Sequence, residues 1–405
     1  MKRIILTLTV LVISVQADWK QWRGPTGQGH ANANLPIEWN EKKNIKWRTT
    51  IPGKGWSSPV IEGNQVWMTT AFETVASEEE RRERLKKNTG GVPVHVLSSV
   101  RLNAVCVDKQ NGKLLHNIEV IAKKQPQWVH KLNSYASPSP IIESGRVYCH
   151  FGAYGTVCVD AKTGKIAWRN DKVWVMHENG PGSTPVLWKN LLIFHMDGSD
   201  QQFVVALDKA TGKERWRTKR SGKMHDNHQL KKSYGTPVLR ELDGKPVLLS
   251  PGSNWLYAYN PATGKELWKV EYGGLGFSLV PRPVTGHGMI FMSTGYMRPK
   301  LLAVRYEKTA KPDIAWSYSR SVSTQPSPLL VGDELYFITE SGGLVTCLNA
   351  HTGEKHWVER IGGNYSSSPT YASGKIYFHS REGETTVIKS GKTFEVIAKN
   401  KLDGQ

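Results

Sequence analysis

The chain has 405 residues and a formal net charge of +19, with 54 lysines and arginines against 35 acidic residues. This length allows two or three ordinary domains, but all-β propellers also reach it as single units. A strongly basic surface attracts anionic partners by long-range electrostatics, although it also serves solubility alone. Because the N-terminus predicts export, as shown next, the basic charge does not indicate nucleic-acid binding.

The first 17 residues have the pattern of a secretory signal peptide. Lys2 and Arg3 precede a mostly apolar run over residues 4–15, and Val15-Gln16-Ala17 suits signal peptidase. The run is too short for a stable anchor, and no Cys follows the cleavage site to carry a lipid. The mature chain, residues 18–405, would have a net charge of +17, no transmembrane segment and a periplasmic or extracellular location. A buried first strand is the alternative interpretation.

One sequence motif recurs along the chain and predicts the fold class. It consists of an apolar strand, an Asp or Asn, a Thr-Gly pair and a Trp four residues after the Gly. Clear copies cover residues 157–168, 206–216, 258–268 and 347–357, with weaker copies at 107–113 and 312–316. The spacings of 48, 52, 48 and 41 are typical of four-stranded propeller blades, and they separate Trp168, Trp216, Trp268, Trp316 and Trp357.

The residue types of the motif suit a tight hairpin followed by an anchor between blades. Asp or Asn accepts backbone N–H bonds, and Gly adopts the positive φ that closes the turn. A Trp that buries about 150–250 Å² contributes at most ~4–6 kcal/mol. We therefore expect these rings to pack between neighbouring blades rather than to bind a substrate.

A Ser, Thr or Arg followed by Pro stands before an apolar stretch seven times, and Pro is tolerated at the first residue of a strand. We interpret each pair as the start of an innermost strand. The seven pairs begin at Ser58, Ser137, Thr184, Thr236, Arg282, Ser327 and Ser368. The predicted blades cover residues 57–121, 135–170, 183–220, 233–271, 281–319, 325–361 and 366–401.

An extra strand is predicted at residues 44–50, before the first blade. It has the character of the outer strand of a further blade, whose inner strands would have to follow residue 401. The fold prediction is therefore an all-β propeller of four-stranded antiparallel blades on an eight-bladed plan, with seven complete blades and a truncated C-terminal blade. A seven-bladed ring closed by the N-terminal strand is the alternative.

Two kinds of interruption are candidates for recognition. Residues 77–87 predict an exposed helix inside blade 1, because Ser77 can cap it, acidic residues follow, and basic residues gather toward its end. The connections after blades 1 and 2 carry Trp128, Trp174 and His177, so we expect them at the rim of a binding face. Ordinary packing between blades is the alternative for these three residues.

The repeats resemble those of the pyrroloquinoline-quinone-repeat propeller proteins of environmental bacteria. A more distant similarity links them to the propeller lipoprotein of the outer-membrane barrel-assembly machinery and to quinone-dependent alcohol dehydrogenases. The resemblance covers almost the whole mature chain, from the Trp-x-x-Trp-Arg-Gly-Pro opening of residues 19–25 to residues 362–366. It includes residues 294–304, which look like the branch known only as quinone-like repeat proteins. The motif is specific for the blade and unspecific for activity.

The resemblance to the dehydrogenases implies a vicinal disulfide under the quinone and a calcium site completed by Glu, Asn and Asp. This chain has only Cys106, Cys149, Cys158 and Cys347, and none is adjacent to another. Three of them occupy one strand position in different repeats, which predicts core residues. A disulfide between Cys149 and Cys158 across a tight turn is a hypothesis. We expect no cofactor, because the cysteine pattern does not support pyrroloquinoline quinone with calcium.

No Gly-x-Ser-x-Gly, His-Glu-x-x-His or Cys-x-x-Cys motif occurs, and His225 with His228 lacks a third metal ligand in the sequence. The first hypothesis is therefore an exported, non-enzymatic binding or scaffold propeller with a protein or anionic glycan partner. The second is a quinone-dependent or degenerate oxidoreductase. If a ligand binds at the channel mouth, the turns after the inner strands point to His150, His195, Asn254, Trp255, Tyr296 and Glu340.

Overall fold

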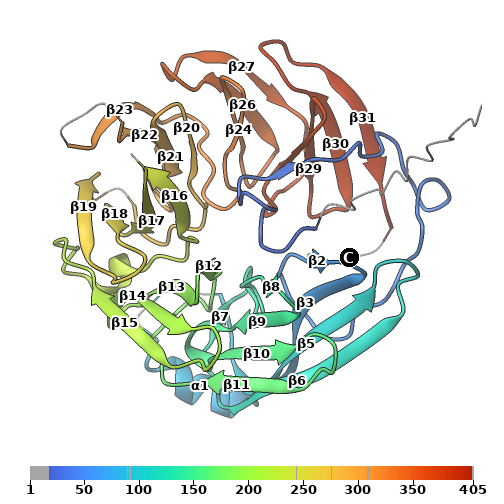
Figure 1. The fold of residues 1–405 in the computed structure, drawn as a ribbon, viewed down its shortest axis with the longest axis vertical. Helices are drawn as coiled ribbons and strands as arrows, with labels where there is room; N and C mark the ends of the chain where they lie inside the picture. The colour runs from blue at the N-terminus through green and yellow to red at the C-terminus, as the bar shows by residue number, and fades with distance from the viewer. Residues whose placement is uncertain are drawn as a thin grey trace, which may run out of the picture.

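The computed structural model describes residues 18–88, 90, 93–242, 244–274, 276–307 and 311–403. The predicted signal peptide, residues 1–17, lies outside the described residues. In the described residues, six antiparallel sheets of four strands and one sheet of five radiate from a common centre as the blades of a β-propeller (Figure 1). The predicted fold class is confirmed.

The blades follow one another in chain order, and the first strand of each blade lies nearest the centre (Figure 1). Blades 1 to 4 contain β2 (Val60–Glu62), β3 (Gln65–Val75), β5 (Leu97–Asp108) and β6 (Leu114–Lys124); β8 (Ile141–Glu143), β9 (Arg146–His150), β10 (Thr156–Asp160) and β11 (Ile166–Asn170); β12 (Val186–Trp188), β13 (Leu191–Asp197), β14 (Gln202–Asp208) and β15 (Glu214–Lys219); and β16 (Val238–Leu242), β17 (Lys245–Gly252), β18 (Trp255–Tyr259) and β19 (Glu266–Glu271).

Blades 5 to 7 repeat this arrangement, and blade 7 gains a parallel fifth strand, β1 (His30–Ala31), beside its innermost strand. Their other strands are β20 (Val284–Gly286), β21 (Met289–Ser293), β22 (Leu301–Arg305) and β23 (Asp313–Tyr318); β24 (Leu329–Val331), β25 (Glu334–Ile338), β26 (Leu344–Asn349) and β27 (Lys355–Arg360); and β28 (Thr370–Ala372), β29 (Lys375–His379), β30 (Glu384–Lys389) and β31 (Val396–Lys401).

Antiparallel order gives the ring two different faces. The linker face carries the connections between blades and the loops between the second and third strands of each blade. The turn face carries the tight turns between the first and second strands and between the third and fourth. Loops on one face of a rigid scaffold are the usual place for binding, so the linker face is the first candidate.

The repeated Trp joins neighbouring blades as predicted. Opposite each Trp the third strand carries a small residue, for example Cys158 opposite Trp168, which leaves room for the ring. The indole Nε1 of Trp168 donates to the carbonyl of Lys209 in the next blade at 2.8 Å. Gly212 lies under the ring with φ 70°, and a Cβ there would come within 2.4 Å of the ring. The Thr-Gly turn and the Trp of the preceding blade therefore form one interlocking unit.

The Ser-Pro and Thr-Pro pairs that precede the innermost strands make a second contact between neighbouring blades. The backbone N–H of Ser139 donates to Thr184 Oγ1, and the N–H of Thr184 donates to Thr236 Oγ1, both at 3.0 Å. Blade 2 takes part through Ser139-Pro140, so the choice of Ser137-Pro138 as its opening was wrong by two residues. The junction between blades 4 and 5 differs, because Arg282 replaces the hydroxyl residue.

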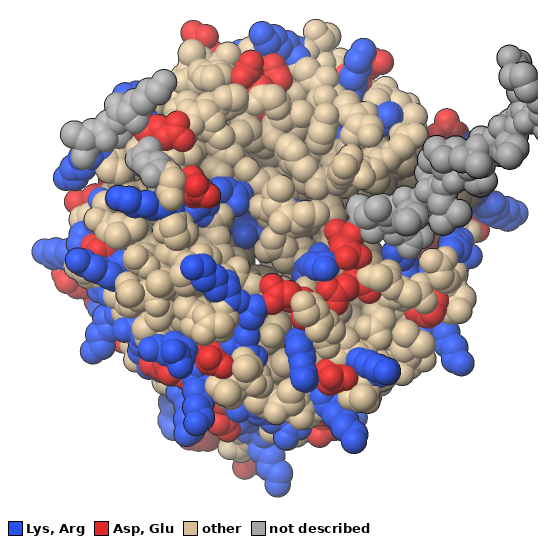
Figure 2. All heavy atoms as spheres, viewed as in Figure 1, with Lys and Arg blue, Asp and Glu red and all other residues tan. Residues whose placement is uncertain are grey.

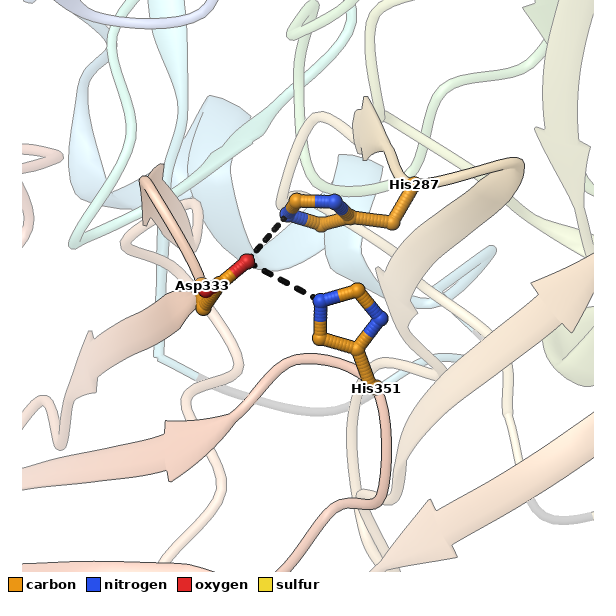
Figure 3. Close-up of side chains that lie close together, drawn as sticks. All are labelled: His287, Asp333 and His351. Atoms are coloured by element: carbon orange, nitrogen blue, oxygen red, sulfur yellow. Dashed lines mark hydrogen bonds and ion pairs between the residues drawn. The ribbon is translucent and has the colours of Figure 1, made fainter.

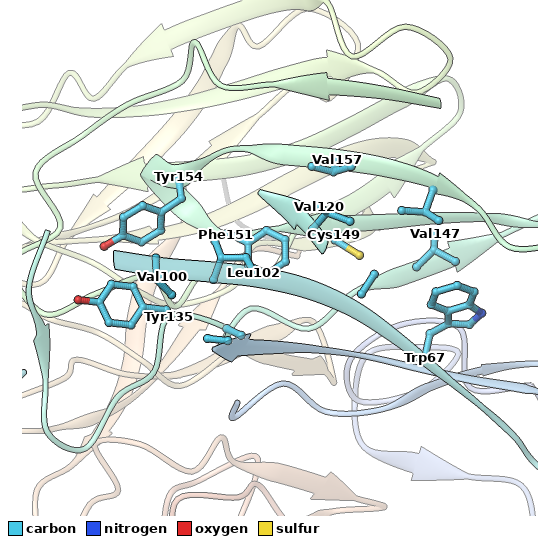
Figure 4. Packing of buried hydrophobic residues seen from close by; sticks show 14 of the residues in the cluster. Trp67, Val100, Leu102, Val120, Tyr135, Val147, Cys149, Phe151, Tyr154 and Val157 are labelled. Atoms are coloured by element: carbon cyan, nitrogen blue, oxygen red, sulfur yellow. The ribbon is translucent and has the colours of Figure 1, made fainter. Parts of the chain in front are cut away.

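The apolar core lies between adjacent blades. Figure 4 shows the cluster shared by blades 1 and 2, in which Trp67, Leu102 and Phe151 are fully buried. All four cysteines are buried and free, as expected of core residues. The predicted disulfide is wrong: Cys149 pairs with Val157, and Cys158 pairs with Tyr148. Residues one position apart in register point to opposite faces of a sheet, so the two sulfur atoms lie in different cores.

Residues 44–50 are not a strand, which corrects the prediction for this segment. They nevertheless make the contacts of an outer strand: Trp47 Nε1 donates to the carbonyl of Lys109 at 2.8 Å, and Thr49 Oγ1 donates to that of Gly112 at 2.6 Å. This segment thus takes the outer position of an eighth blade, between the red sheet of blade 7 and blade 1 (Figure 1). The arrangement agrees with the eight-bladed plan.

Residues 18–31 cross the middle of the turn face. The segment begins at blade 1, where Trp19 bridges Ile61, and ends at blade 7, where β1 pairs with β28. Between these ends, Gln28 bonds Thr285 of blade 5 at 2.8 Å, and His30 bonds the carbonyl of Leu330 of blade 6 at 2.7 Å. The N-terminal segment therefore connects blades that are far apart in the ring and covers the inner part of this face.

Candidate functional site

The structure brings together three of the predicted site residues, His150, His177 and His195, beneath the linker face of blades 2 to 4. All three side chains are buried. His150 bonds Thr156 Oγ1 at 2.8 Å and packs on the ring of Phe194, and His177 Nε2 accepts the N–H of Ala153 at 2.8 Å. Burial lowers the pKa of His150 to about 3, with a further effect from His177, and burial lowers the pKa of His177 to about 4. These imidazoles are neutral at physiological pH.

A fully buried ion pair lies beside the histidines. Arg220 NH2 and Asp197 Oδ2 are 2.7 Å apart, and a second bond joins Arg220 Nε to Asp197 Oδ1 at 3.1 Å. Ser250 Oγ accepts from Arg220 at 2.9 Å and bonds His195 Nδ1 at 3.0 Å. Burial alone would lower the pKa of Arg220, but Asp197 and the neighbouring tyrosines raise it above its ordinary value. Both carboxylate oxygens of Asp197 are engaged within blade 3, and Arg220 joins blade 3 to blade 4 through Ser250 and through Tyr259 Oη at 3.3 Å.

Glu178 and Lys232 are two further buried charges near the same face. Glu178 has a left-handed backbone with φ 65°, Ser199 Oγ donates to its Oε1 at 3.1 Å, and its Oε2 has no partner among the described residues. Lys232 Nζ donates to Gln229 Oε1 at 2.6 Å. Burial lowers the pKa of Lys232 to about 8, and Glu178 counteracts this shift. The two connections after blades 2 and 3 therefore place opposite charges below the surface.

The remaining predicted residues lie apart from this cluster. Trp255 Nε1 donates to the carbonyl of Lys223 at 2.8 Å, and Asn254 precedes it in a tight turn with φ 65°. Glu340 Oε1 accepts backbone N–H groups of Thr324 and Gln325, which fixes the connection between blades 5 and 6. These three residues have structural partners rather than a shared pocket.

Trp128 is part of an arm that rises from blade 1, and not of an exposed rim. The arm consists of the extended ends of β3 and β5, helix α1 (Glu78–Leu85) and the small sheet of β4 (Val94–His95) and β7 (Val129–His130). Ser77 caps α1 by accepting the N–H of Glu80. Trp128 is buried in the core of the arm, with its Nε1 unpaired in the described part of the chain.

Exposed apolar side chains are concentrated on the linker face. Of the 13 large apolar residues that are exposed in the described ranges, seven lie in its loops or at strand ends there, and none lies in the tight turns of the turn face. Five others are on outer strands, and Ile45 is in the eighth position. The seven are Trp56, Val75, Leu132, Trp174, Val280, Tyr296 and Met297. The exposed apolar side chains of the described residues that lie outside the outer strands and the eighth position are thus confined to one of the two faces.

Sequence reasoning missed three parts of the site. Arg220 and Lys232 lie in connections that carry no sequence motif. On the turn face, His287, Asp333 and His351 come together although they are far apart in sequence. Their common feature is their place in tight turns of blades 5 and 6, which an alignment of the repeats could have revealed.

A ring of four-stranded blades, joined by the Trp and Thr-Gly unit, defines a β-propeller of pyrroloquinoline-quinone-type repeats. A family model described as outer membrane protein assembly factor BamB matches residues 82–218 and 200–346. These matches span more than half of the chain, and the chain belongs to this family. No curated protein matches the sequence.

Three solved structures share the fold at low sequence identity. BamB from Moraxella catarrhalis is 14% identical with a TM-score of 0.52, covering 76% of this chain and 91% of its own. Quinohemoprotein alcohol dehydrogenase from Comamonas testosteroni is 14% identical with a TM-score of 0.57, covering 92% and 77%. Quinohemoprotein alcohol dehydrogenase ADHIIG from Pseudomonas putida is 13% identical with a TM-score of 0.53, covering 93% and 76%. At these identities the similarity shows the fold alone.

Across the described residues, no helix is long and apolar enough to span a membrane.

Proposed function

We propose that this propeller is exported and acts as a non-catalytic binding module that docks a protein partner on its linker face. The observation that carries the proposal is the concentration of exposed apolar side chains there, with Trp56 67% and Met297 69% exposed. Exposed aromatic residues and Met are enriched where proteins bind each other. The family's description as an assembly factor supports a protein as the partner.

The arm of blade 1 gives this face a shape that a partner can recognise. Its strands β3 and β5 have 11 and 12 residues, whereas β9 and β10 of blade 2 have five each. Arg84 of α1 donates to the carbonyl of Leu97 at 2.6 Å, which ties the helix to the strand. Val75 is 72% exposed near the tip of the arm, and Leu132 is 57% exposed in the connection after it. A rigid arm with apolar residues beside it favours binding without a large ordering cost.

A quinone-dependent oxidoreductase is the second candidate, since two similar structures are quinohemoprotein alcohol dehydrogenases. The residues do not fit a quinone with calcium. The four cysteines are single and buried, so no vicinal disulfide can form. Calcium needs six to eight oxygen ligands, but Asp197 is bound on both oxygens by Arg220 and Ser199 engages Glu178. The absence of adjacent cysteines and the engagement of Asp197 by Arg220 are the observations that favour a scaffold over a quinone enzyme.

An anionic glycan is the alternative partner, suggested by the net charge. Figure 2 shows basic side chains spread round the face in view and interspersed with acidic ones, without one continuous basic patch. Electrostatic capture of a glycan would weaken with ionic strength, whereas apolar docking would not. Salt dependence therefore distinguishes the two partners.

Photo-crosslinking in cells that export the protein tests the proposal. A photoreactive residue replaces Trp56, Leu132 or Met297 on the linker face. Leu267 and Val396 on outer strands are the controls, since they are apolar and also exposed, at 45% and 41%. We expect a discrete protein adduct from the linker-face positions alone, and the complex should persist at high salt. Equal adducts from all five positions, or none, would contradict the proposal. A saturable absorbance change when the protein is titrated with quinone and calcium would instead favour the oxidoreductase.

A further inference from the structure

We propose that His287, Asp333 and His351 form a binding site for a transition-metal ion such as Zn²⁺ on the turn face, across blades 5 and 6. Each residue lies in a different tight turn: His287 between β20 and β21, Asp333 between β24 and β25, and His351 between β26 and β27. Figure 3 shows both imidazole rings directed at the carboxylate of Asp333. The repeat of the blade brings these turns together, because corresponding turns of neighbouring blades lie side by side.

The spacing of the ligand atoms suits a small tetrahedral ion. His351 Nε2 is 2.9 Å from Asp333 Oδ1, and His287 Nε2 is 3.6 Å from the same oxygen. One ligand atom from each of the three residues lies within 4.8 Å of the others. Bonds of about 2.0–2.1 Å in tetrahedral zinc separate neighbouring ligand atoms by about 3.3 Å. The two contacts to Asp333 are within a few tenths of an ångström of this spacing, and the two imidazole nitrogens, which lie within 4.8 Å of each other, would move toward each other on binding.

The donor set selects the class of ion. Two imidazoles and one carboxylate are typical ligands of zinc and similar transition metals, whereas Mg²⁺ and Ca²⁺ prefer oxygen ligands only. One negative ligand beside two neutral rings leaves a positive metal centre in which water can complete the coordination.

Access and local backbone structure support the same assignment. The side chains of His287 and His351 are 27% and 48% exposed, and both residues line a groove of about 560 Å³ with Arg305 and Glu307. His287 has a left-handed backbone, with φ 54°. Its Nε2 also bonds the carbonyl of Gly332 at 2.8 Å, so binding of a metal would replace this contact. The bound ion would fasten blade 5 to blade 6.

Calorimetric titration of the purified, metal-free mature chain with Zn²⁺ tests the proposal. We expect one ion per chain and no measurable binding of Mg²⁺. The variants His351→Ala and Asp333→Asn should weaken zinc binding at least about tenfold, since each removes or blunts one ligand. His225→Ala is the matched control, because His225 is equally an exposed loop histidine and lies in the connection after blade 3.

Cobalt provides a readout of coordination that simple surface adsorption would not give. Co²⁺ in a site with nitrogen and oxygen ligands at low coordination number should produce intense visible absorption, which His351→Ala should abolish. The variants change exposed turn residues, and unchanged thermal unfolding without metal would show that they fold. Zinc binding that survives in both variants, or that is lost in His225→Ala, would overturn the proposal.

Discussion

Two junctions of the ring are made by the same Trp contacts, although the Trp stands on a β-strand in one and on an irregular segment in the other. The first joins blade 2 to blade 3, and the second joins the eighth position to blade 1. Trp168 and Trp47 each donate to a turn carbonyl at 2.8 Å, and each ring lies over a Gly with φ of 70° or 74°. Trp168 belongs to a strand of a complete sheet, whereas Trp47 belongs to a segment with no strand partners. The docking of an outer segment thus depends on its own side chains bonding to turn carbonyls of the next blade, and does not require that the segment belong to a sheet.

Removing each Trp ring in turn should show how much stability the contact contributes when the ring stands on a sheet and when it does not. Trp168→Ala should lower the free energy of unfolding by about 3–5 kcal/mol, because a buried ring leaves a cavity between two blades. Trp47→Ala should lower it by about 1 kcal/mol or less, since its segment can detach while the seven sheets remain. Chemical denaturation measures both costs, and hydrogen exchange should show residues 44–50 released in Trp47→Ala. Equal costs would mean that the eighth position is as integral as a blade.

Acidification should act on the first junction, because the buried His150 and His177 lie under blades 2 to 4. His150 and His177 have folded pKa values of about 3 and about 4, whereas an unfolded histidine titrates near 6.5. The unfolded state therefore binds more protons below this value, and stability falls as pH decreases from about 6.5 toward 4. At pH 5 each of the two histidines should therefore lower the free energy of unfolding by about 2 kcal/mol relative to neutral pH.

The variant His177→Gln tests this assignment, since an amide oxygen can still accept the N–H of Ala153. The loss of stability between neutral pH and pH 5 should become smaller by about 2 kcal/mol in this variant. His225→Gln, an exposed control, should keep the full loss. An unchanged pH dependence in His177→Gln would show that other groups cause the acid sensitivity.

The glycines under the two rings offer a finer comparison. Ala at position 212 or 112 adds the same left-handed strain of about 1 kcal/mol. In Gly212→Ala the new Cβ would also meet Trp168, which its strand holds in place, so we expect a total of about 2 kcal/mol. In Gly112→Ala the Cβ would meet Thr49 and Trp47, which can move away, so the cost should stay near the strain alone. Thermal unfolding of the two variants measures the difference.

The blade repeat could be predicted because its signals are local. The Thr-Gly turn, the Trp and the small residue opposite it are fixed by hairpin geometry within about a dozen residues, and the cysteine positions followed from the same register. The disulfide prediction was wrong because a turn of five residues shifts the pairing by one position. The strand at 44–50 was overpredicted because its Trp and Thr make the contacts of an outer strand without sheet partners.

The candidate sites could be predicted only in part, because they depend on contacts between blades. His150 and His195 were found from their positions after inner strands and His177 from its place in the connection after blade 2, but their burial and the Arg220 pair depend on how blades 2 to 4 pack. Trp128 was expected at a rim, and only the fold of the arm shows that it is buried. The cluster of His287, Asp333 and His351 has no local motif and required the ring itself.

The junction between blades 4 and 5 gives the smallest and most specific test of the comparison. Arg282 takes the place of the hydroxyl residue there, so the N–H of Thr236 has no hydroxyl acceptor corresponding to Thr184 or Ser327. The Arg282 side chain is buried, its Nε has no partner among the described residues, and burial lowers its pKa to about 9. It retains one bond, from NH1 to the carbonyl of Trp22 at 3.0 Å.

Arg282→Ser should therefore stabilise the ring by about 1 kcal/mol, because it removes a poorly compensated buried cation and restores the hydrogen bond of the other junctions. Arg215→Ser, which removes an exposed Arg from an outer strand, should change stability by less than about 0.5 kcal/mol. Denaturant unfolding at neutral pH measures both. A clear loss of stability in Arg282→Ser would instead show that Arg282, through Trp22, holds the N-terminal segment across the turn face, and that this segment rather than the hydroxyl contact secures the junction.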